Sequence, residues 1–284
     1  MIILFTGSPG VGKSTLITKI VQSYSGRKFG IISNELRDKN ENRVGFSAQT
    51  LSEDSNPILF AHIHDIDSKH IIGNKYKVSV SNIEKYLVPE LKKGISYEDK
   101  KTPSLIVIDE IGRMQSLSDL FLHTVREVFH SKKAFIGTIT LEDELWNQEF
   151  KTHSDVLLIT ITNSNRDIVG HLFPKIINQL DSLSQLSSSS QKTILSLSKK
   201  YVKNNHWIQL EKLFLNSILY IGQNKVSQIS GSTFKVIGNT NTHLVNKIES
   251  QYTCDCPLFL GKHPYESSPG ECSHIQAVKI FTNT

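Results

Sequence analysis

Apolar and polar residues follow two alternating patterns from Met1 to about Leu180. Short continuous apolar runs, such as Leu105–Ile108, are typical of strands in a sheet that is covered on both faces. Segments with apolar residues at every third or fourth position predict amphipathic helices. The predicted strands are Ile2–Thr6, Gly30–Leu36, Arg43–Thr50, Tyr76–Val80, Ser104–Asp109, Ala134–Ile139 and Val156–Ile161, and the predicted helices are Lys13–Tyr24, Asn82–Lys93, Leu117–His130 and Asp167–Leu180. This alternation predicts an α/β fold with a doubly wound sheet.

The pattern changes after residue 180. Residues 181–190 are rich in serine and are interpreted as a linker. A lysine-bearing helical segment is predicted over 193–220, and short β-like runs follow, separated by glycine and asparagine. These runs are Lys225–Ile229, Thr233–Ile237 and His243–Ile248. We therefore expect three parts: a domain over 1–182, a serine-rich linker and helical segment over 183–222, and a small module over 223–284.

The composition is that of an ordinary soluble protein of 284 residues, of which 38% are hydrophobic. No stretch approaches the ~20 apolar residues of a membrane span, and the first strand leaves no room for a signal peptide before it. These features predict a cytoplasmic protein. The net charge of +5 is unevenly placed, because all six arginines precede Ser182 and the excess of lysine follows it. A weakly basic C-terminal module and an ordinary lysine-rich surface both account for that distribution.

Residues 7–14 read Gly-Ser-Pro-Gly-Val-Gly-Lys-Ser and follow the apolar strand directly. This G-x-x-x-x-G-K-S pattern is a phosphate loop, in which backbone N–H groups and a helix N-terminus surround an anion. Lys13 is expected to reach the β- and γ-phosphates, and the Ser14 hydroxyl to bind Mg²⁺. The predicted nucleotide-binding residues are Gly7, Ser8, Pro9, Gly10, Val11, Gly12, Lys13, Ser14 and Thr15. A chance glycine-rich turn is the weaker explanation, because strand and helix flank the motif as the chemistry requires.

The apolar run Leu105–Ile108 ends in two acids, Asp109 and Glu110. Downstream of a phosphate loop, such a pair is expected to complete the nucleotide site. Asp109 is the predicted Mg²⁺ ligand, and Glu110 is the predicted base that polarises the attacking water. The alternative is a strand that simply ends in solvated acids.

Residues 108–114, Ile-Asp-Glu-Ile-Gly-Arg-Met, resemble the "IDEIGKM" signature of the thermostable prokaryotic nucleoside-triphosphatases and their vertebrate relative, the cancer-related nucleoside triphosphatase. Segments that agree in order are Glu35–Arg37, Arg43–Phe46, Gly137–Ile139 and Asn165–Asp167. The resemblance covers about 1–180. It implies a RecA-like P-loop NTPase fold and Mg²⁺-dependent hydrolysis of ATP, GTP and other triphosphates to the diphosphate, with poor base selectivity.

Two positions depart from that family signature. Arg113 stands where the family usually has lysine, and Gln115 stands where an acid usually follows the methionine. Arg113 keeps the positive charge and is therefore a candidate to stabilise charge in the transition state. Arg37, Arg43 and Arg166 are lesser candidates for phosphate or base contacts, with surface ion pairing as the alternative for each.

All three cysteines lie near the C-terminus, as Cys254-Asp255-Cys256 and Cys272-Ser273-His274. Three thiolates and one imidazole form a complete tetrahedral Zn²⁺ shell, so Cys254, Cys256, Cys272 and His274 are the predicted ligands. An odd number of cysteines and a cytoplasmic setting both disfavour a disulfide. His263, between the two cysteine pairs, is a rival ligand.

The surrounding sequence resembles a SWIM zinc finger over about 224–281. The matching segments are Gly231–Val236, Tyr252–Cys254 and His274–Val278. The resemblance implies a structural zinc and a DNA or protein partner. Aromatic residues that could stack on bases are few, so sequence-specific reading of DNA is not supported.

The function predicted from the sequence is a nucleoside-triphosphatase that a zinc finger attaches to DNA or to a protein. Two alternatives remain open. One is a P-loop kinase of nucleotides or nucleic-acid ends, although no clustered arginines indicate a lid. The other is a DNA- or protein-binding adaptor whose nucleotide state regulates the finger. No membrane partner is expected, and the sequence leaves the oligomeric state open.

Overall fold

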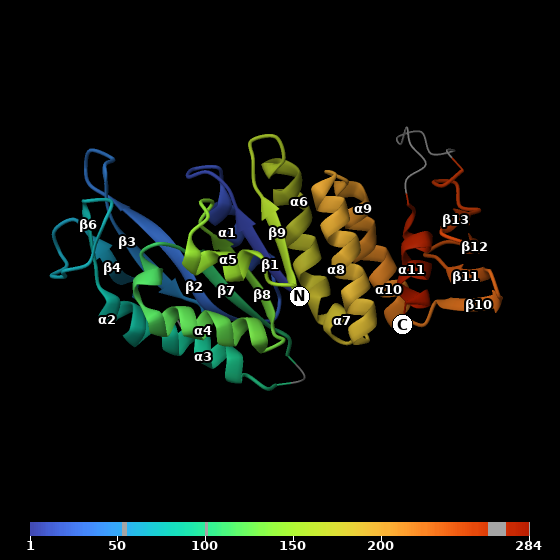
Figure 1. The fold of residues 1–284 in the computed structure, drawn as a ribbon, viewed down its shortest axis with the longest axis horizontal. Coiled ribbons are helices and arrows are strands. Elements are labelled where there is room, and N and C mark those ends of the chain that lie inside the picture. Colours follow the sequence, from blue (N-terminus) through green and yellow to red (C-terminus); the bar gives the residue numbers. More distant parts are fainter. Residues whose placement is uncertain (53–55, 100–101, 261–270, 284) are drawn as a thin grey trace. The chain divides into compact units, whose positions relative to one another are not determined.

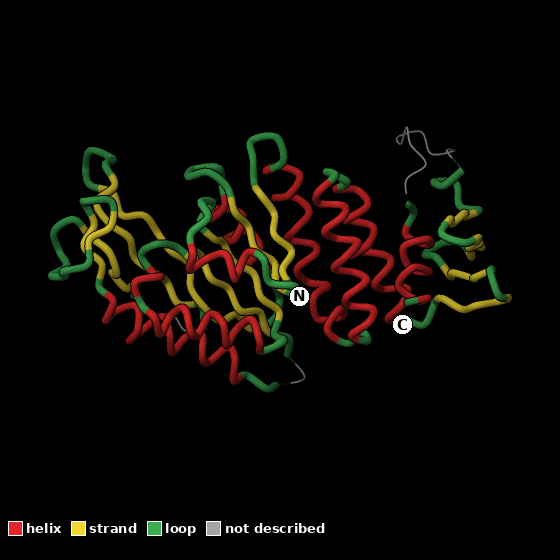
Figure 2. Tube along the Cα trace, viewed as in Figure 1, coloured by secondary structure: helices red, strands yellow, loops and turns green. Residues whose placement is uncertain are grey.

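A computed structural model describes residues 1–52, 56–99, 102–260 and 271–283. The chain divides into two compact units, Met1–Gly170 and His171–Thr284. The first unit contains a large sheet with helices, and the second contains helices and a small sheet (Figures 1 and 2). Each unit contains a cluster of buried apolar residues of its own.

The sheet of the first unit has nine strands in the order β5-β6-β4-β3-β2-β7-β8-β1-β9. Its parallel part consists of β2 (Arg27–Arg37), β7 (Ser104–Ile111), β8 (Ala134–Ile139), β1 (Ile2–Thr6) and β9 (Val156–Thr160). Its antiparallel part consists of β3 (Arg43–Thr50), β4 (Ile58–His62), β5 (Ile71–Ile72) and β6 (Tyr76–Val78). All seven strands predicted for this part of the chain are confirmed, whereas β4 and β5 were not predicted.

The sheet is mixed because β2 is long enough to pair on both sides. Residues Arg27–Ile32 pair in parallel with β7, and Ile31–Arg37 pair with β3 in an antiparallel hairpin. The expectation of a doubly wound sheet therefore describes the parallel part alone, and the strands β3–β6 extend it beyond the switch to antiparallel pairing.

Helices cover both faces of the parallel strands (Figure 1). On one face, α3 (Val88–Ser96) and α4 (Asp119–His130) pack side by side over a buried cluster that includes Leu4, Ile106 and Ile108. Residues of β1 that alternate with Leu4 point to the opposite face of the sheet. On that face, α1 (Lys13–Ser23) contacts β2 and β8. Shorter elements of this unit are α2 (Val80–Asn82), the π-helical η1 (Ile83–Leu87), the 3₁₀ turn η2 (Gln115–Leu117) and α5 (Leu145–Lys151).

Helix α6 (Arg166–Ile176) is followed by the 3₁₀ turn η3 (Ile177–Gln179) and then by the helices of the second unit. These are α7 (Leu180–Ser184), α8 (Ser188–Lys203), α9 (Trp207–Lys212), the π-helical η4 (Leu213–Ser217) and α10 (Ile218–Gly222). The interpretation of residues 181–190 as a linker was wrong, because most of them are helical. Ser187 is the N-cap of α8 and accepts a hydrogen bond from the Ser190 backbone N–H. Serine is a favoured cap, so a serine-rich segment here begins a helix.

The small sheet contains β10 (Val226–Ser230), β11 (Thr233–Ile237), β12 (Thr242–Ile248) and β13 (Gln251–Cys254), paired antiparallel in that order. Helix α11 (Ser273–Thr282) packs against all four strands and against α8, η4 and α10. Its residues 273–278 are all buried. The helix therefore joins the small sheet to the helices of this unit. The three predicted β-like runs are confirmed, and β13 was not predicted.

Candidate functional site

The phosphate loop lies between β1 and α1, as the sequence predicts. Gly7, Gly10 and Gly12 all have positive φ angles, of 148°, 77° and 106°. At Gly10 and Gly12 a side chain would have room, so backbone conformation alone requires glycine there. At Gly7 a Cβ atom would also lie 2.5 Å from the carbonyl oxygen of Ile161. The Lys13 ammonium donates to the carbonyl oxygens of Gly7 and Ser8, at 2.7 and 3.2 Å.

Asp109 is buried near the end of β7, where the residue is 1% exposed. Its Oδ1 accepts a 2.6 Å hydrogen bond from the Thr138 hydroxyl of β8. Burial raises the pKa of the Asp109 carboxyl, while the hydrogen bond from Thr138, the nearby Ser14 hydroxyl and the charge of Lys13 oppose that shift. Its Oδ2 is buried and has no hydrogen-bond partner among the described residues. Asp109 therefore lies near Ser14 and has one carboxylate oxygen, Oδ2, that is available to a ligand.

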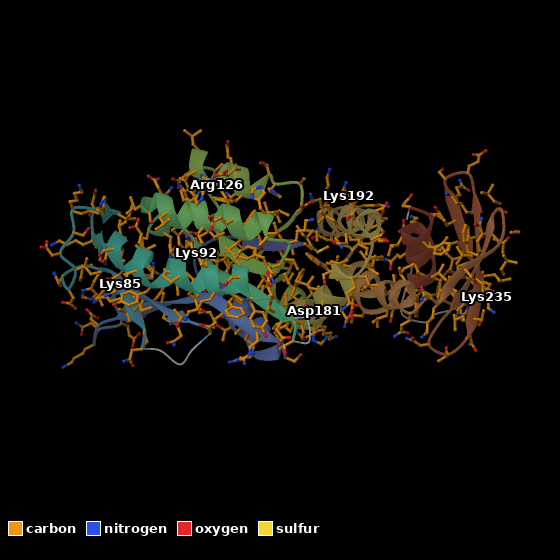
Figure 3. The ribbon with its side chains drawn as sticks, turned by 90° about the horizontal axis from the view of Figure 1, so that it is seen from below. Lys85, Lys92, Arg126, Asp181, Lys192 and Lys235 are labelled. Carbon is orange, nitrogen blue, oxygen red and sulfur yellow. The ribbon has the colours of Figure 1, made fainter. Side chains whose placement is uncertain are left out.

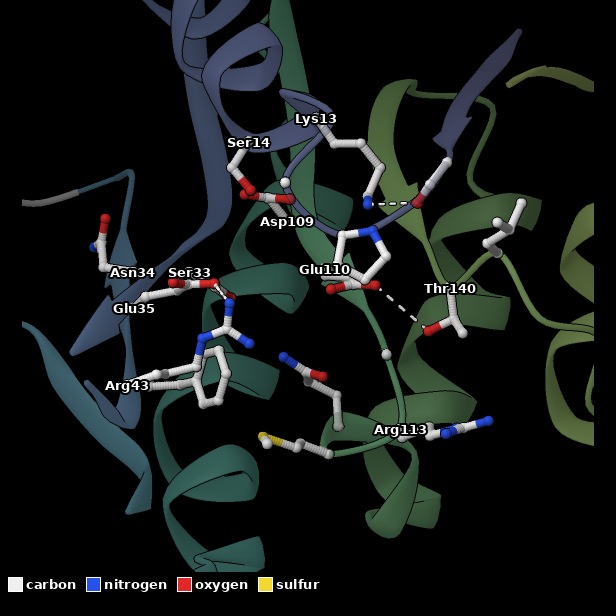
Figure 4. A pocket seen from close by; sticks show the side chains of 18 of the residues that line it. Lys13, Ser14, Ser33, Asn34, Glu35, Arg43, Asp109, Glu110, Arg113 and Thr140 are labelled. Atoms are coloured by element: carbon white, nitrogen blue, oxygen red, sulfur yellow. Dashed lines mark hydrogen bonds and ion pairs between the residues drawn. The ribbon is translucent and has the colours of Figure 1, made fainter. Parts of the chain in front are cut away.

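Glu110 lies in the same cavity as Lys13 and Ser14 (Figure 4). The Thr140 hydroxyl donates to its Oε1 at 3.4 Å. Burial raises the pKa of the Glu110 carboxyl, and the neighbouring Asp109 charge raises it further, while Lys13 lowers it. A carboxylate with a raised pKa beside a phosphate loop has the properties of a general base.

Arg113 contributes to the wall of this cavity, but its guanidinium is paired elsewhere. Its Nε donates to Glu144 Oε1 at 2.5 Å, and the side chain is 53% exposed. Figure 4 shows the Arg113 guanidinium pointing away from Lys13 and Asp109. The proposed role of Arg113 in stabilising the transition state would therefore require it to leave Glu144.

The cavity has a volume of about 630 Å³ and extends from the phosphate loop to strands β2, β3 and β4. Ser33, Arg43, Phe46 and Phe60 line its far part. Of these, the sequence suggested only Arg43 as a phosphate contact. It also missed Thr138 and Thr140 as partners of the two acids, although Thr138 lies within a segment that resembles the nucleoside-triphosphatase family.

The four predicted zinc ligands converge in the second unit. One potential ligand atom from each of Cys254, Cys256, Cys272 and His274 lies within 4.8 Å of all the others. The cysteines are reduced and buried. Mutual hydrogen bonding between Cys254 and Cys256 raises the pKa of the first thiol and lowers that of the second. The rival ligand His263 lies outside the described residues.

Neighbouring side chains hold the His274 ring in place. The Tyr220 ring stacks on it with a centroid distance of 5.7 Å and an interplanar angle of 7°. The His243 ring also contacts it, with the two ring centroids 4.3 Å apart, and the Nδ1 atom of His243 is 3.0 Å from Asp255 Oδ1.

Basic side chains in this unit, such as Lys192 and Lys235, are exposed (Figure 3). In the described part of the chain, no helix is both long and apolar enough to span a bilayer.

A family model described as NTPase matches residues 2–177. The nucleoside-triphosphatase THEP1 of Thermotoga maritima is 34% identical over 167 residues, which are 59% of this chain and 90% of the relative. The crystal structure of THEP1 from Aquifex aeolicus superposes with a TM-score of 0.53 at 31% identity, covering 60% of this chain and 95% of that one. The solution structure of a human cancer-related nucleoside triphosphatase superposes with a TM-score of 0.53 at 27% identity, covering 64% of this chain and 97% of that one.

The family match spans the sheet, the phosphate loop, the two acids of β7 and the threonines that contact them. The relatives are covered nearly to their full length, whereas the chain continues for more than 100 residues beyond the match. By this match over most of its length, the chain belongs to the NTPase family and is a nucleoside-triphosphatase.

Proposed function

We propose that this enzyme hydrolyses ATP, GTP and other nucleoside triphosphates to the diphosphate and phosphate in a Mg²⁺-dependent reaction. The observation that carries the proposal is the position of Asp109 and Glu110 in the cavity of the phosphate loop. Backbone N–H groups of residues 10–14 bind the phosphates, and Lys13 reaches the β- and γ-phosphates. The Glu110 carboxylate takes a proton from the attacking water.

The donor set fits a magnesium ion. Mg²⁺ prefers hard oxygen ligands, and the unpartnered Oδ2 of Asp109 and the Ser14 hydroxyl are such oxygens. These two residues would hold the ion, which when bound supplies positive charge for the phosphate oxygens. A cation there also offsets the cost of ionising Asp109 in a buried environment.

The test is phosphate release from ATP and GTP by Glu110→Gln. We expect hydrolysis to fall roughly 10²–10⁴-fold, with binding of ATP retained because the phosphate loop is intact. Glu142→Gln is the matched control, since Glu142 is an exposed acid on the wall of the same cavity. An unchanged rate in Glu110→Gln removes Glu110 from the role of base.

For the second unit we propose a SWIM-type zinc finger over 223–284. Zn–S distances of about 2.3 Å place ligand atoms of a tetrahedral shell about 3.8 Å apart. Cys254 Sγ and His274 Nδ1 are 3.8 Å apart, and ligand atoms of all four side chains lie within 4.8 Å of one another, which supports such an ion. With four protein ligands the zinc would be structural, and its binding free energy would contribute to folding. The Asp255 carboxylate on His243 and the Tyr220 ring support the His274 side of the site.

Metal analysis of the purified protein tests this assignment. We expect about one zinc per chain, lost in Cys254→Ser/Cys272→Ser and in His274→Ala but retained in His263→Ala. Loss in His263→Ala with retention in His274→Ala would reverse the choice between the two histidines.

We further propose that the finger binds DNA or a protein and thereby localises the enzyme, in keeping with the surplus of lysine over acidic residues after Ser182. The charge is modest, so binding to DNA would be weak and salt-dependent. Binding curves with and without nucleotide separate a simple attachment from a regulated adaptor. Identical curves are expected for an attachment, and a shift with nucleotide indicates an adaptor.

A further inference from the structure

The cavity at the phosphate loop has a second part that the roles assigned above leave unused. Its walls come from β2, β3 and β4, on strands that lie beyond β7 in the sheet. Glu110 lies between the two parts in the view of Figure 4, with Lys13 and Ser14 on one side and Arg43 on the other. A triphosphate held by residues 7–15 therefore leaves this second part to another occupant.

Unpartnered polar atoms are concentrated in this cavity. Among the described residues, four buried side-chain atoms have no hydrogen-bond partner. Three of them belong to residues that line it: Asp109 Oδ2, Ser33 Oγ and Arg43 Nε. The proposed Mg²⁺ would pair with the first, because the Asp109 carboxyl lies near Ser14. Leaving a buried polar group without a partner is destabilising, so a ligand that pairs with both groups in the second part would remove that cost.

Arg43 and Arg37 compete for the same carboxylate. Glu35 Oε1 pairs with Arg43 at 2.5 Å, and Glu35 Oε2 pairs with Arg37 at 2.8 Å. Two arginines therefore share one carboxylate, which leaves one positive charge in excess. Of the two, only Arg43 lines the cavity. Its Nε–H and the Ser33 hydroxyl are both able to donate to the oxygens of a phosphate, for which the arginine fork is well suited.

The remaining wall is aromatic. The Phe46 ring is half-buried on the cavity surface, and the Arg43 guanidinium lies 5.6 Å from its centroid. Phe60 is buried next to it, with the two centroids 6.3 Å apart. An aromatic wall beside a cationic group fits a ligand with a planar ring, because rings stack on aromatic side chains.

We propose that Ser33, Arg43 and Phe46 form a second subsite, which binds a nucleoside monophosphate, a molecule in which one sugar carries both a phosphate monoester and a planar base. The proposal rests on the proposed binding of a triphosphate at residues 7–15. The monophosphate lies on the Arg43 side of Glu110 and the triphosphate on the Lys13 side. The enzyme therefore binds both ligands at the same time.

Calorimetric titration of the full chain tests the subsite. The phosphate loop is first saturated with Mg²⁺ and a β,γ-imido triphosphate, which is not hydrolysed, and AMP is then added. We expect one further binding event for AMP, and binding at least about tenfold weaker for adenosine and for inorganic phosphate, each of which lacks one half of the recognised structure.

Three variants assign the subsite to its residues. Arg43→Ala and Ser33→Ala should weaken AMP binding, by about tenfold or more for the arginine because a charged hydrogen bond is lost. Arg43→Lys should be intermediate, since it keeps the charge without the fork. Arg37→Ala is the matched control, because Arg37 also pairs with Glu35 but does not line the cavity. Circular dichroism confirms that each variant is folded.

Three results overturn the proposal. The first is no AMP binding to the loaded protein, and the second is an equal loss in Arg37→Ala and Arg43→Ala. The third is a loss of binding of the imido triphosphate itself in Arg43→Ala, because this would assign Arg43 to the triphosphate site. Because hydrolysis is not measured, the outcome is independent of the Glu110→Gln experiment, which tests the proposed reaction.

Discussion

The Thr138 hydroxyl donates a 2.6 Å hydrogen bond to Oδ1 of Asp109, and Oδ2 of that carboxylate has no hydrogen-bond partner among the described residues. The bond crosses from β8 to β7, because Ile108 pairs with Gly137 in the register of these two parallel strands. It favours the ionised form of a carboxyl whose pKa burial raises. Thr138 thus orients the oxygen that is proposed to bind Mg²⁺ and supports its charge.

Replacing Thr138 with valine tests this support. Thr138→Val keeps the shape of the side chain but removes the hydroxyl, so the pKa of Asp109 should rise and its affinity for Mg²⁺ should fall. Loss of a group that orients a metal ligand typically costs about 10–100-fold in affinity. The Mg²⁺ concentration for half-maximal hydrolysis should rise accordingly, while Thr124→Val, in the helix α4, should not change it. A Mg²⁺ dependence equal to that of the wild type contradicts this role.

The pH dependence of kcat/KM reports the proposed base in the free enzyme. The Glu110 pKa is raised by burial and by Asp109. Because only the ionised carboxylate accepts a proton, kcat/KM should fall as the pH drops through a value above 4.5, the ordinary pKa of this carboxyl. Thr140→Val removes a hydrogen bond that lowers this pKa, so the acid limb should move to still higher pH. A limb at or below pH 4.5 in both proteins would exclude Glu110 as the titrating group.

Arg113 and Glu144 form a pair that is half exposed at the edge of the cavity. Because the Arg113 guanidinium is bound to Glu144, we expect Arg113→Ala to lower kcat by less than ~10-fold, which corresponds to about 1.4 kcal/mol of barrier. Glu144→Gln should have an effect of similar size. A loss of kcat above 100-fold in Arg113→Ala alone, with KM unchanged, would instead show that Arg113 leaves Glu144 to contact the transition state.

A buried polar network in the second unit connects α11 to the helices before the small sheet. Gln276 is fully buried, and its Nε2 donates to the Tyr201 hydroxyl and to the Gln209 carbonyl, at 3.1 and 3.0 Å. Its Oε1 accepts from the Ser217 hydroxyl at 3.0 Å, and Tyr201 donates to Glu271 at 2.5 Å. The network holds α11, whose first turn carries His274, against these helices.

Gln276→Leu should destabilise the second unit by roughly 2 kcal/mol or more, because partners of the lost amide remain buried and unpaired. The measurement is urea unfolding of the metal-loaded protein, monitored by Trp207 fluorescence in a Trp146→Phe background, with Gln228→Leu on the exposed face of β10 as the control. A smaller effect than in the control would show that the network contributes little to the stability of this unit.

Local sequence determined the parts of this protein whose chemistry lies within a few consecutive residues. The phosphate loop needs glycines at positions with positive φ, followed directly by Lys13 and Ser14, so its pattern is readable from residues 7–14 alone. The two acids near the end of β7 were predicted for the same reason. The composition of the Cys254–His274 segment was equally informative, because every cysteine of the chain occurs there.

Tertiary structure decided which distant side chains serve these motifs. The register of β7 with β8 brings Thr138 to Asp109, and the hairpin of β2 and β3 turns Arg43 toward the cavity while Arg113 turns to Glu144. The serine-rich segment becomes helical because Ser187 caps α8. None of these contacts can be deduced from residue types, since strand register and hydrogen-bond partners depend on how the whole core packs.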